Sequence, residues 1–285
     1  MHDLYQQLKQ FGHVKLNEPL AKHTTFKIGG PADFFVIVEE TEKLVELLRF
    51  LDDEGTAYFI LAGGSNMLVR DEGFRGVVIK IRNNKSEITN QDLIVAEAGC
   101  ITVGIAQKSI QAGFTGFEWG IGVPGTIGGA VRGNAGAMGG EMKAVVEKVE
   151  VYRDGEVITL TNNECEFGYR DSVFKHNHDV ILRVCLKLKK TGSKEGMKKV
   201  LENLQYRNKT QPLGYASTGC IFQNSEFRDQ RSEILDQLKK KYEGDDKVKI
   251  FFEIDKIPAG WLVEQSGMKG AQVGQAKVSE RHGNF

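Results

Sequence analysis

A glycine-rich stretch at residues 116–140 constrains this chain more than any other feature. It reads GFEWGIGVPGTIGGAVRGNAGAMGG, too dense in glycine for the interior of a regular helix or strand. Glycine makes up 33 of the 285 residues, above the usual share of about 7%, while only 5 prolines argue against a disordered linker. We therefore expect this glycine to let backbone approach a ligand closely.

The overall composition predicts a soluble, folded protein of one to three domains. The chain is 40% hydrophobic and 27% charged. Lys+Arg and Asp+Glu both total 38, so no net field attracts nucleic acid or an anionic membrane. The start MHDLYQQLKQ has no apolar signal run, and no apolar segment reaches the ~18 residues that span a bilayer. The sequence therefore predicts a cytoplasmic protein without membrane insertion or nucleic-acid binding.

The cysteines predict neither disulfides nor a metal site. Cys100, Cys165, Cys185 and Cys220 are far apart, with no CxxC pair and no histidine at zinc-finger spacing. The first three are interpreted as reduced, buried hydrophobic residues.

A β-α-β unit is predicted near the start. A strand at 34–38 precedes a helix with Thr41 as N-cap and four leucines on one face, Leu44, Leu47, Leu48 and Leu51. Gly55 ends that helix before a strand at 58–61.

Hairpins and further helices follow, and the mixture favours an α+β fold with three domains. Asp154-Gly155 predicts a hairpin between 149–152 and 157–160. Thr102 is predicted to cap a helix that ends at Gly113. The remaining expected strands are 77–81, 93–98, 179–188 and 247–254, and the remaining helical segments are 194–206, 232–242 and 258–265.

Two glycine loops predict a site for a dinucleotide. LAGGSN, residues 61–66, directly follows a strand, and VPGTIGGAV, residues 123–131, supplies a second run of backbone amides. Either loop alone is equally consistent with a tight turn; together, in a chain without net charge, they favour a cofactor diphosphate held by amides. The literal GxGxxG at Gly120 is rejected as a Rossmann motif because Pro124 interrupts it and more glycine follows. There is no GxxxxGK[ST] phosphate-binding loop either.

Six ordered segments resemble one enzyme family over nearly the whole chain. They are HTTFKIGGPADFF, LAGGSNMLVRDEGFRGVVI, GVPGTIGGAVRGNAGAMGGE, GYRDSVFK, STGCIFQN and IPAGWLVEQSGMKGAQVGQAKVSERHGNF. They are similar to the UDP-N-acetylenolpyruvoylglucosamine reductases, the MurB flavoenzymes of peptidoglycan synthesis. The resemblance implies a two-lobed FAD-binding domain of the PCMH/vanillyl-alcohol-oxidase type, with lobes at 1–76 and 77–192. A MurB-type α+β substrate-binding domain is then implied at 193–285.

The resemblance also implies which residues surround non-covalent FAD. The lack of a side chain at Gly64 and Gly128 is expected to leave room for the phosphates. The implied FAD residues are Gly63, Gly64, Ser65, Asn66, Met67, Pro124, Gly125, Thr126, Ile127, Gly128, Gly129 and Asn134.

Two residues are implied to be catalytic. The family reaction passes a hydride from NADPH through flavin to an enolpyruvyl ether, leaving negative charge next to a carboxylate. Arg170 of GYRDS is implied to hold that carboxylate with its planar guanidinium. Cys220 of STGCIFQN is implied to donate the proton, because a thiol of ordinary pKa about 8.5 is protonated at neutral pH yet far more acidic than an alcohol.

Four further residues are expected to contact the UDP-sugar substrate: Tyr169, Arg207, Lys209 and His282. Tyr206 directly precedes Arg207 in the sequence. No long substrate-capping insertion lies between Arg170 and Tyr206, which indicates the short-loop subclass. We expect a monomer.

The chain departs from the family pattern in three places. FxNP becomes FQNS and is followed by an insertion at about 225–255. A paired glycine late in the chain becomes Gly274-Gln275. The family pattern continues past Phe285 with a segment that bears a catalytic glutamate, so the chain is expected to be incomplete there.

Two other functions stay open. An FAD oxidase of the vanillyl-alcohol-oxidase type is disfavoured because the chain is too short for that group's cap domain. A non-catalytic flavin or nucleotide-sugar binding protein is the alternative if the terminal acid is absent.

Overall fold

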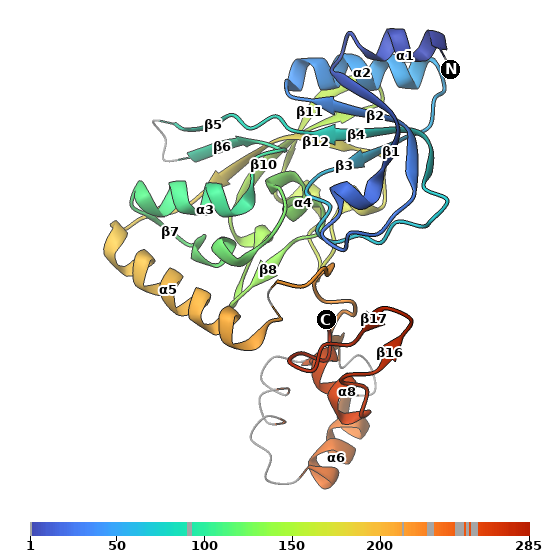
Figure 1. Ribbon diagram of the computed structural model, residues 1–285. Coiled ribbons are helices and arrows are strands. Elements are labelled where there is room, and N and C mark those ends of the chain that lie inside the picture. Colours follow the sequence, from blue (N-terminus) through green and yellow to red (C-terminus); the bar gives the residue numbers. More distant parts are fainter. Residues whose placement is uncertain are drawn as a thin grey trace. The chain divides into compact units, whose positions relative to one another are not determined.

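A computed structural model shows the α+β architecture (Figure 1). It describes residues 2–89, 93–212, 214–226, 231–242, 248, 251 and 256–285. The backbone contacts divide the chain into two compact units, Met1–Arg207 and Asn208–Phe285. Each unit is described below by itself.

The first unit begins with a mixed sheet of strand order β1-β2-β4-β3. β4 pairs in parallel with both β2 and β3, while β1 is antiparallel to β2. Helix α2 joins β2 to β3 and buries Leu44, Leu47, Leu48 and Leu51. The predicted β-α-β unit is therefore confirmed. The elements are α1 (His2–Leu8), β1 (His13–Pro19), η1 (Leu20–His23), β2 (Pro31–Val38), α2 (Thr41–Asp53), β3 (Tyr58–Leu61) and β4 (Phe74–Ile81).

An antiparallel sheet of strand order β11-β10-β12-β6-β5 follows. Asp154 (φ 47°) and Gly155 (φ 86°) form the tight turn of the β10–β11 hairpin, which confirms that prediction. Helix α4 packs on β12 and β6. The elements are β5 (Ser86–Ile88), β6 (Leu93–Glu97), α3 (Thr102–Gln111), β7 (Phe114–Thr115), η2 (Glu118–Gly122), α4 (Ile127–Arg132), β8 (Gly136–Ala137), β9 (Gly140–Glu141), η3 (Met142–Ala144), β10 (Val146–Arg153), β11 (Glu156–Thr161), η4 (Asn163–Cys165), η5 (Val173–Lys175), β12 (Val180–Lys187), β13 (Lys189–Lys190) and α5 (Ser193–Thr210).

A shared core joins the two sheets. Tyr152, Val180 and Leu182 from the second sheet pack with the leucines of α2 and with strands of the first sheet. The hydroxyl of Tyr152 also donates to Asp52 Oδ2 at 2.5 Å. The predicted lobe limit at 76/77 falls inside β4, which pairs with β2 on both sides of that point and with β3 from Val77 onward. We propose that the first lobe extends through Ile81.

Two predicted helix caps are wrong. Glu40 is the N-cap of α2, and the hydroxyl of Thr41 instead donates to Glu97 Oε1 at 2.7 Å. Ile101 is the N-cap of α3, and the Thr102 hydroxyl is buried without a hydrogen-bond partner among the described residues. Thr41 is therefore used in a tertiary contact instead of a cap.

The second unit contains short elements around a small core. Val248 and Phe251 pack with Ile257 and Trp261. Both Val248 and Phe251 are helical, so the strand predicted at 247–254 is wrong at these two positions. The other residues of that segment lie outside the described part, as does much of the predicted insertion at 225–255 (227–230, 243–247, 249–250 and 252–255). The elements are β14 (Ser225–Glu226), α6 (Arg231–Lys241), β15 (Lys256–Ile257), α8 (Ala259–Gln265), β16 (Gln272–Val273) and β17 (Ala276–Lys277).

Within the described residues, every helix is too short or too polar to cross a membrane.

Candidate functional site

The loop after β3 presents free backbone amides. Gly64 adopts φ 64°, and the carbonyl of Ala62 accepts a hydrogen bond from Lys80 Nζ. Among the described residues no group accepts a hydrogen bond from the amides of residues 63–67. Consecutive free amides in a bent loop form a concave anion-binding site, so this loop can hold a phosphate.

The second glycine loop lies against the first. Ser65 Oγ donates to the carbonyl of Pro124 at 3.4 Å, and a Cβ built on Gly63 would be 2.6 Å from Gly125 Cα. The structure therefore brings together the two loops that the sequence analysis linked.

The amides at the start of α4 are already bonded within the protein. Ile127 N donates to Cys100 O at 2.8 Å, Gly128 N to Ala98 O at 3.0 Å and Gly129 N to Thr126 Oγ1 at 3.4 Å. The expectation that this segment offers a second wall of free amides is therefore wrong at these three positions.

The glycines are needed for contacts within the protein. A Cβ at Gly64 would lie 2.0 Å from the carbonyl oxygen of His23, and one at Gly128 would lie 2.8 Å from Ala98 Cβ. These glycines allow close approach to neighbouring segments, and the room that they leave for the phosphates remains a prediction. A Cβ at Gly129, by contrast, would meet Ala62 and Thr126 at an ordinary 3.6 Å.

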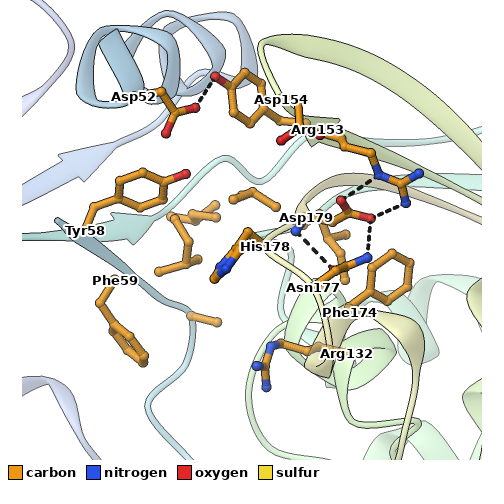
Figure 2. Close-up of a pocket in the computed structure, with 18 of the residues that line it drawn as sticks. Asp52, Tyr58, Phe59, Arg132, Arg153, Asp154, Phe174, Asn177, His178 and Asp179 are labelled. Carbon is orange, nitrogen blue, oxygen red and sulfur yellow. Dashed lines mark hydrogen bonds and ion pairs between the residues drawn. The ribbon is translucent and has the colours of Figure 1, made fainter. Parts of the chain in front are cut away.

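A cavity of about 1440 Å³ lies next to these loops within the first unit (Figure 2). It runs from Ala62, Thr126 and Gly129 past the residues of β3 to the end of α2. Its walls come from both sheets, since Tyr58 belongs to β3 and Ile181 to β12. The residues that line it include Asp52, Tyr58, Phe59, Ile60, Ala62, Thr126, Gly128, Gly129, Arg132, Tyr152, Arg153, Phe174, His176, Asn177, His178, Asp179 and Ile181.

Carboxylates and phenols meet at the α2 end of the cavity. Burial, and then the nearby Asp52 carboxylate, raises the pKa of Tyr58 to about 12. Burial and the hydrogen bond to Asp52 also raise the pKa of Tyr152. Arg153 donates two hydrogen bonds to Asp179, at 2.8 and 2.6 Å, and Asn177 donates to the same carboxylate (Figure 2). This end can therefore accept hydrogen bonds from a ligand's amino or hydroxyl groups.

Arg170 lies at the tip of a tight turn. Reciprocal hydrogen bonds of 3.0 and 3.2 Å between Gly168 and Asp171 close the turn, and Arg170 has φ 56°. A left-handed conformation costs a non-glycine residue about 1–2 kcal/mol. The guanidinium donates to the carbonyls of Gly136 at 2.7 Å and Asn134 at 3.4 Å.

The charge of Arg170 has no carboxylate partner within 4.0 Å among the described residues. A guanidinium has five N–H donors, so donors remain beyond those bound to the two carbonyls. The arrangement orients Arg170 without neutralising it, which suits the binding of an anionic group.

Asn134 and Met67 face the protein. Asn134 is 1% exposed; its side chain donates to Gly168 O and Glu141 Oε2 and accepts from Lys143 N. Met67 packs against the core around Phe35. Direct contact of either side chain with FAD remains a prediction, and the geometry gives Asn134 the role of fixing the turn that bears Arg170.

Cys220 lies in the second unit, in a segment held by the end of the chain. Its side chain is exposed. The next residues, Ile221 and Phe222, donate from their amides to the carbonyl and side chain of Asn284 at 3.1 and 2.8 Å. The STGCIF and HGNF motifs are thus joined by hydrogen bonds.

His282 belongs to the same group. Its Nδ1 accepts a hydrogen bond from Asn284 N at 3.2 Å, and burial lowers its pKa. A neutral ring that accepts at Nδ1 carries its proton on Nε2, so His282 offers one donor.

Of the other residues expected to bind substrate, Tyr169 and Arg207 belong to the first unit and Lys209 to the second. The Tyr169 ring lies 5.7 Å from Arg170 Cζ. Within the first unit Arg207 packs against η2, since a Cβ on Gly122 would be 2.7 Å from its Cδ. Lys209 is exposed near the end of α5, in the second unit.

The chain matches two protein families along its length. Residues 32–161 match the FAD binding domain family, and residues 211–285 match the UDP-N-acetylenolpyruvoylglucosamine reductase C-terminal domain. The UDP-N-acetylenolpyruvoylglucosamine reductase of Caldanaerobacter subterraneus is 38% identical over 285 residues, which cover 99% of this chain and 84% of the relative. That of Carboxydothermus hydrogenoformans is 38% identical over 94% of this chain and 80% of the relative. The chain belongs to the UDP-N-acetylenolpyruvoylglucosamine reductase family.

Solved structures agree with this family and with the expected fold class. The reductase (MurB) from Thermus caldophilus is 31% identical, with a TM-score of 0.75 over 96% of this chain and 87% of that one. Alkyldihydroxyacetonephosphate synthase, 16% identical with a TM-score of 0.51 over 67% of this chain and 40% of that one, shares the fold of the FAD-binding part. The predicted combination of this fold with a MurB C-terminal domain is confirmed.

The cavity fits the FAD that this family match implies. The free amides of residues 63–67 suit a diphosphate, and the cavity, which has apolar lining residues such as Phe59 and Ile181, is large enough for a dinucleotide. Thr126, Gly128 and Gly129 were expected at FAD and do line the cavity.

The sequence analysis missed the walls made by Tyr58, Phe59 and residues 176–181. Two expected strands gave a signal: 58–61, which precedes a glycine loop, and 179–188, which begins inside the segment 176–181. The segment 176–181 has no motif, and the packing of Val180 and Leu182 against the first sheet brings it to the cavity.

Proposed function

We propose that the chain is an NADPH-dependent reductase that uses FAD to convert UDP-N-acetylglucosamine enolpyruvate to UDP-N-acetylmuramate, in peptidoglycan precursor synthesis. The observation that carries this proposal is the unneutralised guanidinium of Arg170, fixed by backbone carbonyls, in a chain of this family. When bound, FAD supplies hydride transfer. The cytoplasmic location and the monomeric state are parts of the same proposal.

The first unit would hold the cofactor. The amides of residues 63–67 would bind the diphosphate, and Thr126 and Gly129 would border it. The cavity continues from this loop along β3 to Asp52 and Tyr58. Because carboxylates and a phenol suit ribose and adenine, we propose that this arm takes the adenosine half of FAD.

The chain's own side chains would manage charge and protons. Arg170 would bind the substrate carboxylate through two parallel hydrogen bonds and stabilise negative charge that develops beside it. Cys220, which is exposed, would donate a proton to the α-carbon. Lys209, Arg207, Tyr169 and the Nε2–H of His282 are proposed to contact the UDP-sugar.

The test measures the two half-reactions separately. We expect NADPH to bleach the flavin absorbance, and the enolpyruvyl substrate then to restore it without oxygen. Restoration by oxygen alone, with no effect of the sugar, would favour an oxidase. A protein that binds flavin or UDP-sugar and catalyses neither step would favour the binding-protein alternative.

The released flavin identifies the cofactor and its linkage. Acid precipitation is expected to release all the flavin as FAD, because the linkage is proposed to be non-covalent. Flavin that stays on the polypeptide would contradict this part of the proposal.

A further inference from the structure

Lys175 contacts the turn that bears Arg170. Its Nζ donates to the carbonyl oxygen of Arg170 at 2.5 Å. Lys175 is the last residue of the GYRDSVFK motif, and the proposed chemistry gives it no role. Its target is the carbonyl of the one residue in that turn with a positive φ.

The base of Lys175 is rigidly held. It ends η5, where its amide donates to Ser172 O at 3.0 Å. The buried hydroxyl of Ser172 donates to Arg132 O at 2.7 Å, and Phe174 is buried in the core. The ammonium group of Lys175 therefore reaches the turn from an anchored support.

Three contacts restrain Arg170 from different directions. Lys175 binds its carbonyl, the carbonyls of Asn134 and Gly136 bind its guanidinium, and Asn134 Nδ2 holds Gly168 O at 2.7 Å. A strained conformation persists only where its surroundings over-determine it. Of these restraints, Lys175 alone acts on the peptide group of Arg170 itself.

We propose that Lys175 is a positioning residue for the reaction: it holds the Arg170 peptide in the left-handed conformation that directs the guanidinium to the substrate carboxylate. This inference rests on the proposed function for its catalytic consequence, although the restraint can be measured without turnover.

The kinetic test compares FAD-loaded variants. Lys175→Met keeps the chain length and removes the donor, Lys175→Arg keeps a donor, and Lys148→Met is the control because Lys148 is exposed on β10. We expect Lys175→Met to lower kcat/KM for the enolpyruvyl substrate about 10- to 100-fold, the range for losing a hydrogen bond to a charged group. Flavin reduction by NADPH alone should not change. Lys175→Arg should recover most of the loss, and Lys148→Met should match the wild type.

The structural test follows hydrogen exchange of the amides of Gly168 and Asp171, whose hydrogen bonds close the turn. Lys175→Met should accelerate this exchange, and neither control variant should. Unchanged exchange would overturn the proposed restraint even if the wild type lacked reductase activity. Faster exchange with unchanged kcat/KM in an active enzyme would overturn the role in the reaction, and equal loss in Lys175→Met and Lys175→Arg would overturn the role of the donor.

Discussion

Gly64 and Gly55 have the same left-handed backbone conformation. Replacing each by alanine therefore separates the cost of that conformation from the cost of steric contact. Gly64 has φ 64° in the loop after β3, and Gly55 has φ 61° at the end of α2. Replacement of either by alanine places a side chain in the left-handed region, which costs about 1–2 kcal/mol. Any difference between Gly64→Ala and Gly55→Ala therefore comes from what the new Cβ meets.

The surroundings of the two positions differ sharply. A Cβ at Gly64 would lie 2.0 Å from His23 O, whereas nothing lies within 4 Å of a Cβ at Gly55. Overpacking costs about 1–3 kcal/mol, so we expect Gly64→Ala to lower the free energy of unfolding by about 2–5 kcal/mol. Gly55→Ala should lower it by about 1–2 kcal/mol.

The assay combines thermal unfolding of the flavin-free protein with FAD titration. At about 2–4 °C per kcal/mol, we expect Tm to fall by about 2–8 °C in Gly55→Ala and by about 4–20 °C in Gly64→Ala. The loop at Gly64 must move away from His23, so its amides lose alignment, and losing one charge-assisted hydrogen bond weakens FAD binding about 10-fold or more. Gly55→Ala should bind FAD normally. Equal Tm losses, or full FAD affinity in Gly64→Ala, would refute the argument.

Three further predictions concern single side chains. Cys220→Ser should keep measurable turnover, whereas Cys220→Ala should reduce the enolpyruvyl substrate on the order of 10²-fold more slowly. Flavin reduction by NADPH should be unchanged in Cys220→Ala. A fully active alanine variant would exclude the thiol as the proton donor. Arg170→Lys keeps the charge but not the planar fork, so KM for the sugar substrate should rise about 10-fold or more at unchanged flavin content, and an unchanged KM would contradict carboxylate binding by Arg170. Burial raises the pKa of Glu18, but the hydrogen bond from His23 and nearby lysines outweigh it and leave the pKa lowered. The stability from Glu18 is therefore present above pH 4.5 and lost as pH falls through the lowered pKa, and Glu18→Gln should flatten the acid side of a Tm profile.

The parts of the fold that were predictable depend on local chemistry. The hairpin at Asp154-Gly155 formed as expected because its turn needs two residues at positive φ. Helix α2 formed because its leucines share one face. The free amides of residues 63–67 were predictable because they lie in a glycine-rich bend that directly follows a strand.

The parts that were missed depend on tertiary contacts. Thr41 has the right type for a cap, but Glu97 lies 2.7 Å from its hydroxyl. The support that Asn134 gives to the Arg170 turn was not predicted, because it depends on contacts of its side chain with Gly168 and Lys143. The cavity wall at residues 176–181 depends on how β12 packs against the first sheet. No local pattern in the sequence carries this information.

The α2 end of the cavity gives a direct test of cofactor orientation. Burial and Asp52 raise the pKa of Tyr58 to about 12. Protonated Tyr58 therefore contributes its full stability below the ordinary pKa of 10, and this contribution is lost as pH rises through 12. Asp52→Asn removes the charge but not the burial, so the pKa of Tyr58 should fall and remain above 10. The measurement is the tyrosinate absorbance against pH, with the matching Tyr58→Phe variant subtracted in each background. An unchanged pKa in Asp52→Asn would show that burial alone sets it.

If the adenosine half of FAD occupies this arm, FAD should exclude water from Tyr58 and raise its pKa further, whereas FMN, which lacks that half, should not. The same shift with FMN would place the isoalloxazine at this end and reverse the proposed orientation.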